Sequence, residues 1–236
     1  MNLLESLNSE QLSAVLHKNG SLLIVAGAGT GKTTVIAQRI AYIIKQEWAK
    51  SDEILALTFT EKATVEMEKR IGELLPVGYS DLWISTFHSF GETILKQHGL
   101  AIGLPSDFKL LNEFEQWVLI KKNLDKFDLN YYRPLGNPTK FIYALLRHFS
   151  RAKDENINQA DYLAYAEGLK ENLDNMLGGC KKLKKNKTDE KIISQEIDRV
   201  NEVANAYHVY QQLLLDNNVS DFGDLINYCL KLFKDR

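Results

Sequence analysis

The chain has 236 residues, of which 44% are apolar and 25% charged, with a formal net charge of −2. This length suits one large domain or two small ones with a real core, and the composition excludes a disordered or fibrous protein. The near-neutral charge excludes a strongly basic polyanion binder, although a local basic groove remains compatible with it.

The cysteines and the N-terminus bear on the compartment. Cys180 and Cys229 lie far apart and lack metal-ligand spacing, which favours a reducing, intracellular protein without disulfides. No apolar run reaches the length of a membrane span, and "MNLLESLNSEQ" lacks the basic-then-apolar order of a signal peptide. The sequence therefore predicts a cytoplasmic protein with no membrane partner.

The first hundred residues alternate apolar runs with helical periodicity. The runs "SLLIVAG" (21–27), "EILALTFT" (53–60) and "LWISTF" (82–87) each predict a buried strand, and a helix is expected after each of them. Gly99 is expected to end the third helix as its left-handed C-cap. This alternation predicts an α/β layer with a parallel sheet.

The character of the sequence then changes. From about residue 101 to 218 it carries helix signals and no convincing strand. Asn112 with Glu115 forms a capping-box pattern, and Asn137 before a proline is typical of another helix start. Thr188 is expected to cap a long helix through Leu215, and a last helix is expected over about 221–234. The sequence thus predicts an α/β segment followed by an all-helical one.

Residues 25 to 34 read "VAGAGTGKTT", the pattern of a phosphate-binding loop except that Ala26 stands where the first glycine is usual. Alanine is compatible there if its φ is negative. Backbone N–H groups and the next helix N-terminus would bind phosphate oxygens, Lys32 would reach the β- and γ-phosphates, and Thr33 would hold Mg²⁺. The alternative is a glycine-rich turn with a surface lysine. The expected nucleotide contacts are Ala26, Gly27, Ala28, Gly29, Thr30, Gly31, Lys32, Thr33 and Thr34, with Lys32 and Thr33 catalytic.

Five stretches of the sequence occur in a characteristic order: "LNSEQLSAV" (7–15), "AGAGTGKT" (26–33), "LALTFTEKATVEM" (55–67), "ISTFHSF" (84–90) and "DFGDLI" (221–226). In this order they resemble the Q motif, motifs I, Ia and Ib and the later DFDDL motif of superfamily 1 helicases of the UvrD/Rep/PcrA class. The resemblance implies an incomplete RecA-like P-loop NTPase sheet with an all-α inserted subdomain. Residues 1–100 would begin domain 1A, 101–218 would form subdomain 1B, and 219–236 would return to domain 1A.

The resemblance also implies the activity. It predicts the N-terminal part of an ATP-dependent 3′-to-5′ DNA helicase, with ATP and Mg²⁺ as cofactors and single-stranded DNA and single/double-strand junctions as partners. Gln11 is expected on the adenine, since a side-chain amide can pair with adenine N6 and N7; otherwise it is an exposed polar residue. The family's Walker B segment, a "DExx" at the end of a buried strand, is not recognised in the sequence. We therefore expect the missing second RecA-like domain to follow in the same chain, and residues 1–236 alone to be inactive as an ATPase.

The expected DNA contacts lie at the carboxyl ends of the second and third strands, where ligands of open α/β sheets bind. A base would stack on Phe59, while Thr60 and Lys62 would meet phosphate. Thr86 and His88 take the equivalent place after the third strand. Two alternatives stay open: Phe59 belongs to the core, or His88 is a capping residue at its edge.

Three residues depart from the family pattern. Glu61 stands where asparagine is usual, Thr34 where some members have arginine, and Gly223 where aspartate is usual. Asp221 and Asp224 are interpreted as helix-start residues, and no carboxylate is expected at a buried strand end where it could replace the missing catalytic acid.

Other classes of protein remain open. A RecB/AddA-type helicase-nuclease subunit shares motifs I, Ia and Ib. A nucleotide-dependent DNA-binding module without a motor would also account for the motifs. A P-loop kinase would leave "TFTEKATVEM" and "TFHSF" unexplained.

Overall fold

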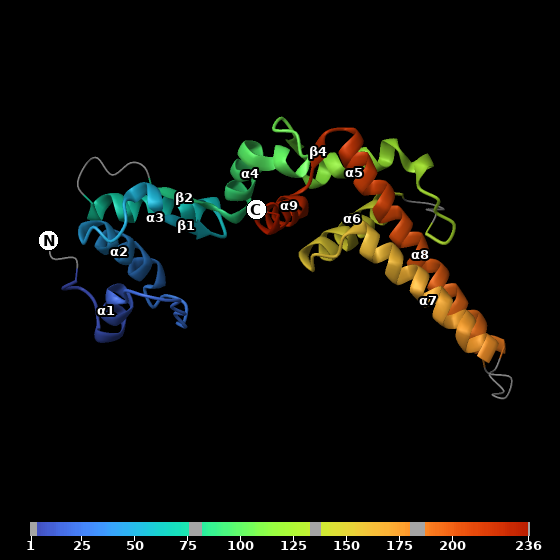
Figure 1. The fold of residues 1–236 in the computed structure, drawn as a ribbon, viewed down its shortest axis with the longest axis horizontal. Helices are drawn as coiled ribbons and strands as arrows, with labels where there is room; N and C mark the ends of the chain where they lie inside the picture. The colour runs from blue at the N-terminus through green and yellow to red at the C-terminus, as the bar shows by residue number, and fades with distance from the viewer. Residues whose placement is uncertain (1–3, 76–81, 133–137, 180–186, 236) are drawn as a thin grey trace. The chain divides into compact units, whose positions relative to one another are not determined.

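The computed structural model describes residues 4–75, 82–132, 138–179 and 187–235 (Figure 1). The chain is a mostly helical α/β protein with small parallel sheets, as its element order shows. It divides into two compact units, Met1–Phe90 and Gly91–Arg236. In the described part of the chain, no helix is both long and apolar enough to cross a membrane.

The first unit contains a two-stranded parallel sheet. Strand β1 (Leu55–Thr58) pairs with β2 (Trp83–Thr86) in the register Leu55 to Trp83 through Thr58 to Thr86. The strands predicted over 53–60 and 82–87 are thus confirmed. Because the strands are parallel, Thr58 and Thr86 end side by side at the same edge of the sheet.

Three helices of the first unit are α1 (Ser9–Leu16), α2 (Lys32–Lys45) and α3 (Glu61–Leu74). Helices α2 and α3 bury apolar stripes against each other, as their 3.6-residue periodicity predicts, and Ala56 of β1 joins the same cluster. The buried cluster consists of Ala37, Ile40, Ala41, Ile44, Ala56, Met67, Ile71 and Leu75.

The strand predicted over 21–27 is not formed. These residues carry no strand assignment, and the side chains of Leu23 and Val25 are 86% and 88% exposed. A continuous apolar run becomes a central strand only when strands flank it and layers cover both faces. Among the described residues, β1 and β2 pair only with each other, so the segment has no strand neighbour.

The second unit is built mainly of helices. Helix α4 (Phe87–His98), which begins in the first unit, leads to α5 (Glu113–Lys122), α6 (Pro138–Asp154), α7 (Gln159–Gly179), α8 (Lys187–Asp216) and α9 (Phe222–Lys234). Figure 1 shows α7 and α8 side by side as a long hairpin. Short 3₁₀ helices occupy Ser51–Glu53, Gly99–Ile102 and Leu124–Lys126.

The core of the second unit joins α5, α6 and α8. The ring of Phe149 stacks on Tyr207 and Tyr210, with centroids 5.1 and 5.3 Å apart. The cluster consists of Leu111, Ile120, Phe127, Leu129, Ile142, Leu145, Leu146, Phe149, Ala152, Ala206, Tyr207, Tyr210, Leu213 and Leu214.

Several predicted helix ends differ from the structure. The capping box of Asn112 and Glu115 is confirmed. The prediction that Gly99 is the left-handed C-cap of α4 is wrong. The residue with a positive φ, 82°, is Gly103, which follows a 3₁₀ turn, whereas Gly99 packs against Leu104. Helix α8 begins at Lys187, so Thr188 lies within its first turn instead of capping it. The predicted cap Asn137 lies outside the described residues, as does Cys180.

The helical stretch also contains a strand that the sequence analysis missed. Strand β3 (Lys109–Leu110) pairs in parallel with β4 (Val219–Ser220). Two residues are too few to show an alternating pattern. Their pairing across more than a hundred residues arises only from tertiary folding.

Candidate functional site: a phosphate loop and a polar strand edge

The phosphate loop has the backbone that its glycines predict. Gly29 and Gly31 adopt φ of 77° and 84°, in the left-handed region that favours glycine. Ala26 is not among the residues with positive φ, which agrees with the expectation that alanine fits there. The Thr30 hydroxyl donates to the Gly27 carbonyl at 2.8 Å and tightens the turn.

Lys32 and the N-terminus of α2 are oriented toward this loop. Lys32 Nζ donates to the carbonyls of Ala26, at 2.9 Å, and Gly27. The N-cap of α2 is Gly31, which supplies no side-chain acceptor to the first-turn N–H groups. Uncapped N–H groups at a helix N-terminus suit an anion. Thr33 follows Lys32 in this first turn, so the residues present fit a triphosphate with its Mg²⁺.

Helix α1 brings Gln11 to the loop. The Gln11 amide donates to the Thr30 carbonyl at 3.2 Å and lies 3.3 Å from the place where a Cβ on Gly31 would stand. Its oxygen also accepts from the Asn8 backbone N–H, closing a capping box at the start of α1. Gln11 is therefore half-buried and hydrogen-bonded to the glycine-rich loop.

Arg39, which the sequence analysis did not single out, anchors α1 to α2. Its Nη1 donates to the carbonyls of Ala14, Val15 and His17 at 2.9, 3.3 and 2.6 Å. A cation at a helix C-terminus is favourable because it meets the unpaired carbonyls and the negative end of the dipole. The location of Gln11 thus depends on an arginine elsewhere in the fold.

Arg70 is a second residue that the sequence analysis missed. From α3 it donates to the Thr34 hydroxyl of α2 at 3.1 Å, and it also pairs with Glu66. A guanidinium thus lies beside Thr34, the position at which the sequence analysis noted a departure from the family pattern. The Glu66–Arg70 spacing predicts their mutual pair, but only the packing of α3 on α2 brings Arg70 to the loop.

The carboxyl ends of β1 and β2 bring together most of the predicted DNA residues. Phe59 is 90% exposed, so it lies outside the core that the described residues form. Its ring lies beside that of Phe87, with centroids 5.4 Å apart. Thr60 is the N-cap of α3, and its hydroxyl accepts from Ala63 N–H at 3.1 Å. Lys62 is exposed in the first turn of α3.

Thr86 and His88 differ in their surroundings. Thr86 is only 6% exposed, and its hydroxyl lies within hydrogen-bond distance of Glu61 and Ser89. His88 is exposed in the first turn of α4. We call Phe59, Thr60, Glu61, Thr86 and Ser89 the strand-end cluster. Helix α3 links it to the phosphate loop, because Arg70 lies nine residues after Glu61, roughly 14 Å along the helix.

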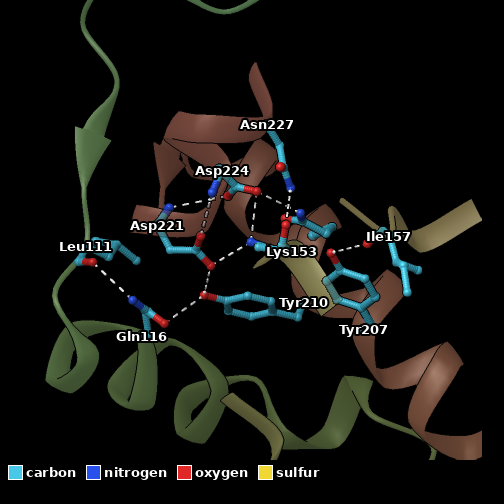
Figure 2. A network of polar contacts seen from close by, with 10 residues as sticks. Leu111, Gln116, Lys153, Ile157, Tyr207, Tyr210, Asp221, Asp224 and Asn227 are labelled. Carbon is cyan, nitrogen blue, oxygen red and sulfur yellow. Dashed lines mark hydrogen bonds and ion pairs between the residues drawn. The ribbon is translucent and has the colours of Figure 1, made fainter. Parts of the chain in front are cut away.

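A buried ion-pair network lies in the second unit (Figure 2). Lys153 Nζ lies 2.6 Å from Asp221 and 2.8 Å from Asp224, and its side chain is fully buried. Tyr210 donates to Asp221 at 2.9 Å, and Gln211 donates to Asp224 at 2.9 Å. Burial raises the pKa of Asp224, an effect that Lys153 opposes and Asp221 reinforces.

Two predictions about these aspartates have different outcomes. Asp221 is the N-cap of α9 in a capping box with Asp224, so their helix-start role is confirmed. The expectation that no carboxylate at a buried strand end could replace the missing catalytic acid stays a prediction: Asp221 directly follows β4 and is 6% exposed, but it caps α9 and pairs with Lys153. The sequence analysis also missed that Lys153 is buried beside Asp221. A lysine in the last turns of an amphipathic helix is expected to be exposed, so only the tertiary structure reveals this pair.

The sequence was compared with known proteins. Residues 7–236 match the family described as the UvrD/REP helicase N-terminal domain. The chain is 35% identical to the ATP-dependent DNA helicase PcrA of Bacillus subtilis, covering 98% of the chain and 26% of that protein. It is 35% identical to DNA helicase II of Rickettsia typhi (98% and 30%) and 39% identical to DNA helicase II of Escherichia coli (54% and 18%). The chain thus spans less than a third of each relative.

Proposed function

Because the chain belongs to the UvrD/REP helicase N-terminal domain family, we propose that it is the N-terminal ATP- and single-stranded-DNA-binding part of an ATP-dependent DNA helicase. The whole enzyme would couple ATP hydrolysis to 3′-to-5′ translocation and unwinding. The observation that carries this proposal is the uncapped N-terminus of α2 behind a loop with two left-handed glycines, Gly29 and Gly31. An enzyme of this kind works where the DNA lies, in the cytoplasm or nucleoid.

ATP would bind across the phosphate loop. Backbone N–H groups of residues 27–33 would surround the phosphates, and Lys32 would exchange its contacts with the Ala26 and Gly27 carbonyls for phosphate oxygens. Thr33 would hold Mg²⁺, which neutralises phosphate charge when bound. Gln11 would exchange its bond to Thr30 for one to the adenine, and Arg70 would add positive charge beside Thr34.

Single-stranded DNA would cross the carboxyl ends of β1 and β2. The exposed ring of Phe59, next to Phe87, offers a face for stacking a base. Lys62 and the hydroxyls of Thr60 and Thr86 would meet phosphates, with His88 at the start of α4. A single/double-strand junction is the proposed substrate of the whole enzyme.

We also propose how the two units belong to the family architecture. Residues 1–100 and 219–236 would form part of a RecA-like domain 1A, and 101–218 the inserted helical subdomain 1B. The exposed apolar segment Leu22–Val25 would become a strand once further strands of the same domain flank it. The catalytic acid and the arginines of a second RecA-like domain would come from the rest of the same polypeptide.

Calorimetric titration of ATP into the full-length protein tests the nucleotide site. Lys32→Ala should abolish detectable binding, because the lysine charge on the phosphates is lost. Lys45→Ala is the matched control, since it removes an exposed lysine from the other end of the same helix. Equal binding in the Lys32 variant and the wild type would refute the assignment of the loop.

A further inference from the structure

We propose that the carboxylate of Glu61 occupies the position of a DNA phosphate in the strand-end cluster and restrains the binding of single-stranded DNA. This inference rests on the proposed function, because it assumes that DNA crosses the ends of β1 and β2. It assigns a regulatory role to Glu61, one of the residues that depart from the motif pattern given in the sequence analysis.

The first observation is the hydrogen bonding of this carboxylate. Ser89 Oγ donates to Glu61 Oε1 at 3.1 Å, and Thr86 Oγ1 lies 3.2 Å from the same oxygen and 2.9 Å from Ser89 Oγ. A hydroxyl has one proton to donate. Since Thr86 can donate to Ser89 and Ser89 to Glu61, the two hydroxyls form a chain that ends on the carboxylate.

The second observation is the place of this contact. Thr86 ends β2, and Glu61 is the first residue of α3, immediately after its N-cap Thr60. Hydroxyl donors and a helix N-terminus together favour an anion. In this structure the anion is a side chain of the protein itself. A phosphate that seeks the same hydroxyls must displace Glu61.

The third observation is exposure. Glu61 and Lys62 are exposed, as is the neighbouring Phe59 ring. A DNA strand stacked on Phe59 would therefore pass a carboxylate beside the lysine expected to meet its backbone. Glu61 would lower the affinity in two ways: its charge repels phosphate, and its oxygen engages the Ser89 hydroxyl.

Two variants separate these effects in the full-length protein. Glu61→Gln removes the charge and keeps an oxygen that accepts from Ser89, whereas Glu61→Ala removes both. Binding of a fluorescently labelled oligothymidylate should tighten about three- to tenfold at low salt in Glu61→Gln, and further in Glu61→Ala. The gain should shrink as salt rises, because exposed charges are screened.

Controls define the outcome. Glu68→Gln removes an equally exposed acid from the same helix and should leave the affinity unchanged. Ser89→Ala should weaken binding in the Glu61→Ala background but not in the wild type, where Glu61 already holds the hydroxyl. Equal affinity of the Glu61 and Glu68 variants, or the same Ser89 effect in both backgrounds, would overturn the inference.

A further variant distinguishes this inference from the proposed function. Phe59→Ala should weaken DNA binding whether or not Glu61 restrains it. If Phe59→Ala binds more weakly and the Glu61 variants behave as the wild type, the DNA site stands and the inference fails. If neither the wild type nor any variant binds the oligothymidylate, the proposed DNA site and the inference about Glu61 are both refuted.

Discussion

The aliphatic stem of Lys153 lies so close to Gly223 that a Cβ on this glycine would stand 2.8 Å from both Cβ and Cδ of the lysine. The stem carries the charged end of Lys153 to Asp221 and Asp224 at the start of α9. Gly223 therefore makes room for the buried ion pairs, which gives a physical reason for glycine at this position.

Gly223→Ala should destabilise the protein by about 1–3 kcal/mol, because the new methyl group overpacks the site. Urea unfolding followed by circular dichroism measures this free energy. Gly168→Ala is the matched control: this glycine lies in α7 with no atom near its virtual Cβ, so alanine should stabilise by about 0.5–1 kcal/mol. Wild-type stability of the Gly223 variant would contradict the packing argument.

Lys153→Met should cost about 3–5 kcal/mol of unfolding free energy, because it leaves two buried carboxylates without their cation. The triple variant that adds Asp221→Asn and Asp224→Asn should recover part of this loss, since it removes the uncompensated charge. The same urea titrations measure both variants. If the triple variant is less stable than Lys153→Met, the carboxylates do not depend on Lys153 for their burial.

The free energy of unfolding should fall, through Asp224, as the pH rises above the ordinary pKa of an aspartate carboxyl. Burial raises the pKa of this carboxyl above its ordinary value, so the folded state binds the proton more tightly than the unfolded state. The stabilisation that this proton provides is fully present below the pKa of Asp224 in the unfolded state. It is lost as the pH rises through the higher pKa of Asp224 in the folded state.

Asp224→Asn tests this pH dependence. The variant should flatten the decline of the urea midpoint with pH, whereas Asp198→Asn, at an exposed position of α8, should keep it. An identical pH profile for Asp224→Asn and the wild type would show that the carboxyl titrates alike in both states.

Arg39→Met should weaken ATP binding about two- to tenfold, which corresponds to the loss of one hydrogen bond. The effect would be indirect, because the Arg39 side chain binds carbonyls at the end of α1, the helix that carries Gln11. The loss of Arg39 frees the carbonyl end of α1. Calorimetry with ATP and GTP should show the discrimination between the bases fall, as in Gln11→Ala, while tripolyphosphate binding stays unchanged. A parallel loss of tripolyphosphate affinity would mean that Arg39 supports the loop instead of Gln11.

The sequence by itself determined the local features of this protein. Glycines at 29 and 31 and a lysine at 32 predicted the loop, because left-handed backbone and a helix start are local properties. The capping pair of Asn112 and Glu115, the strands β1 and β2 and the helices after them followed from the same short-range rules.

Only the tertiary structure decided which distant residues meet. Arg70 reaches Thr34 because α3 packs on α2, Glu61 meets Ser89 because β1 and β2 end together, and Lys153 is buried because α6 meets α9. The segment 21–27 shows the converse: its apolar run favours a buried strand, yet burial needs flanking strands that the described residues do not supply. The pattern of apolar and polar residues determines which side chains tend to be buried. Which residues bury them depends on how distant segments pack in the folded chain.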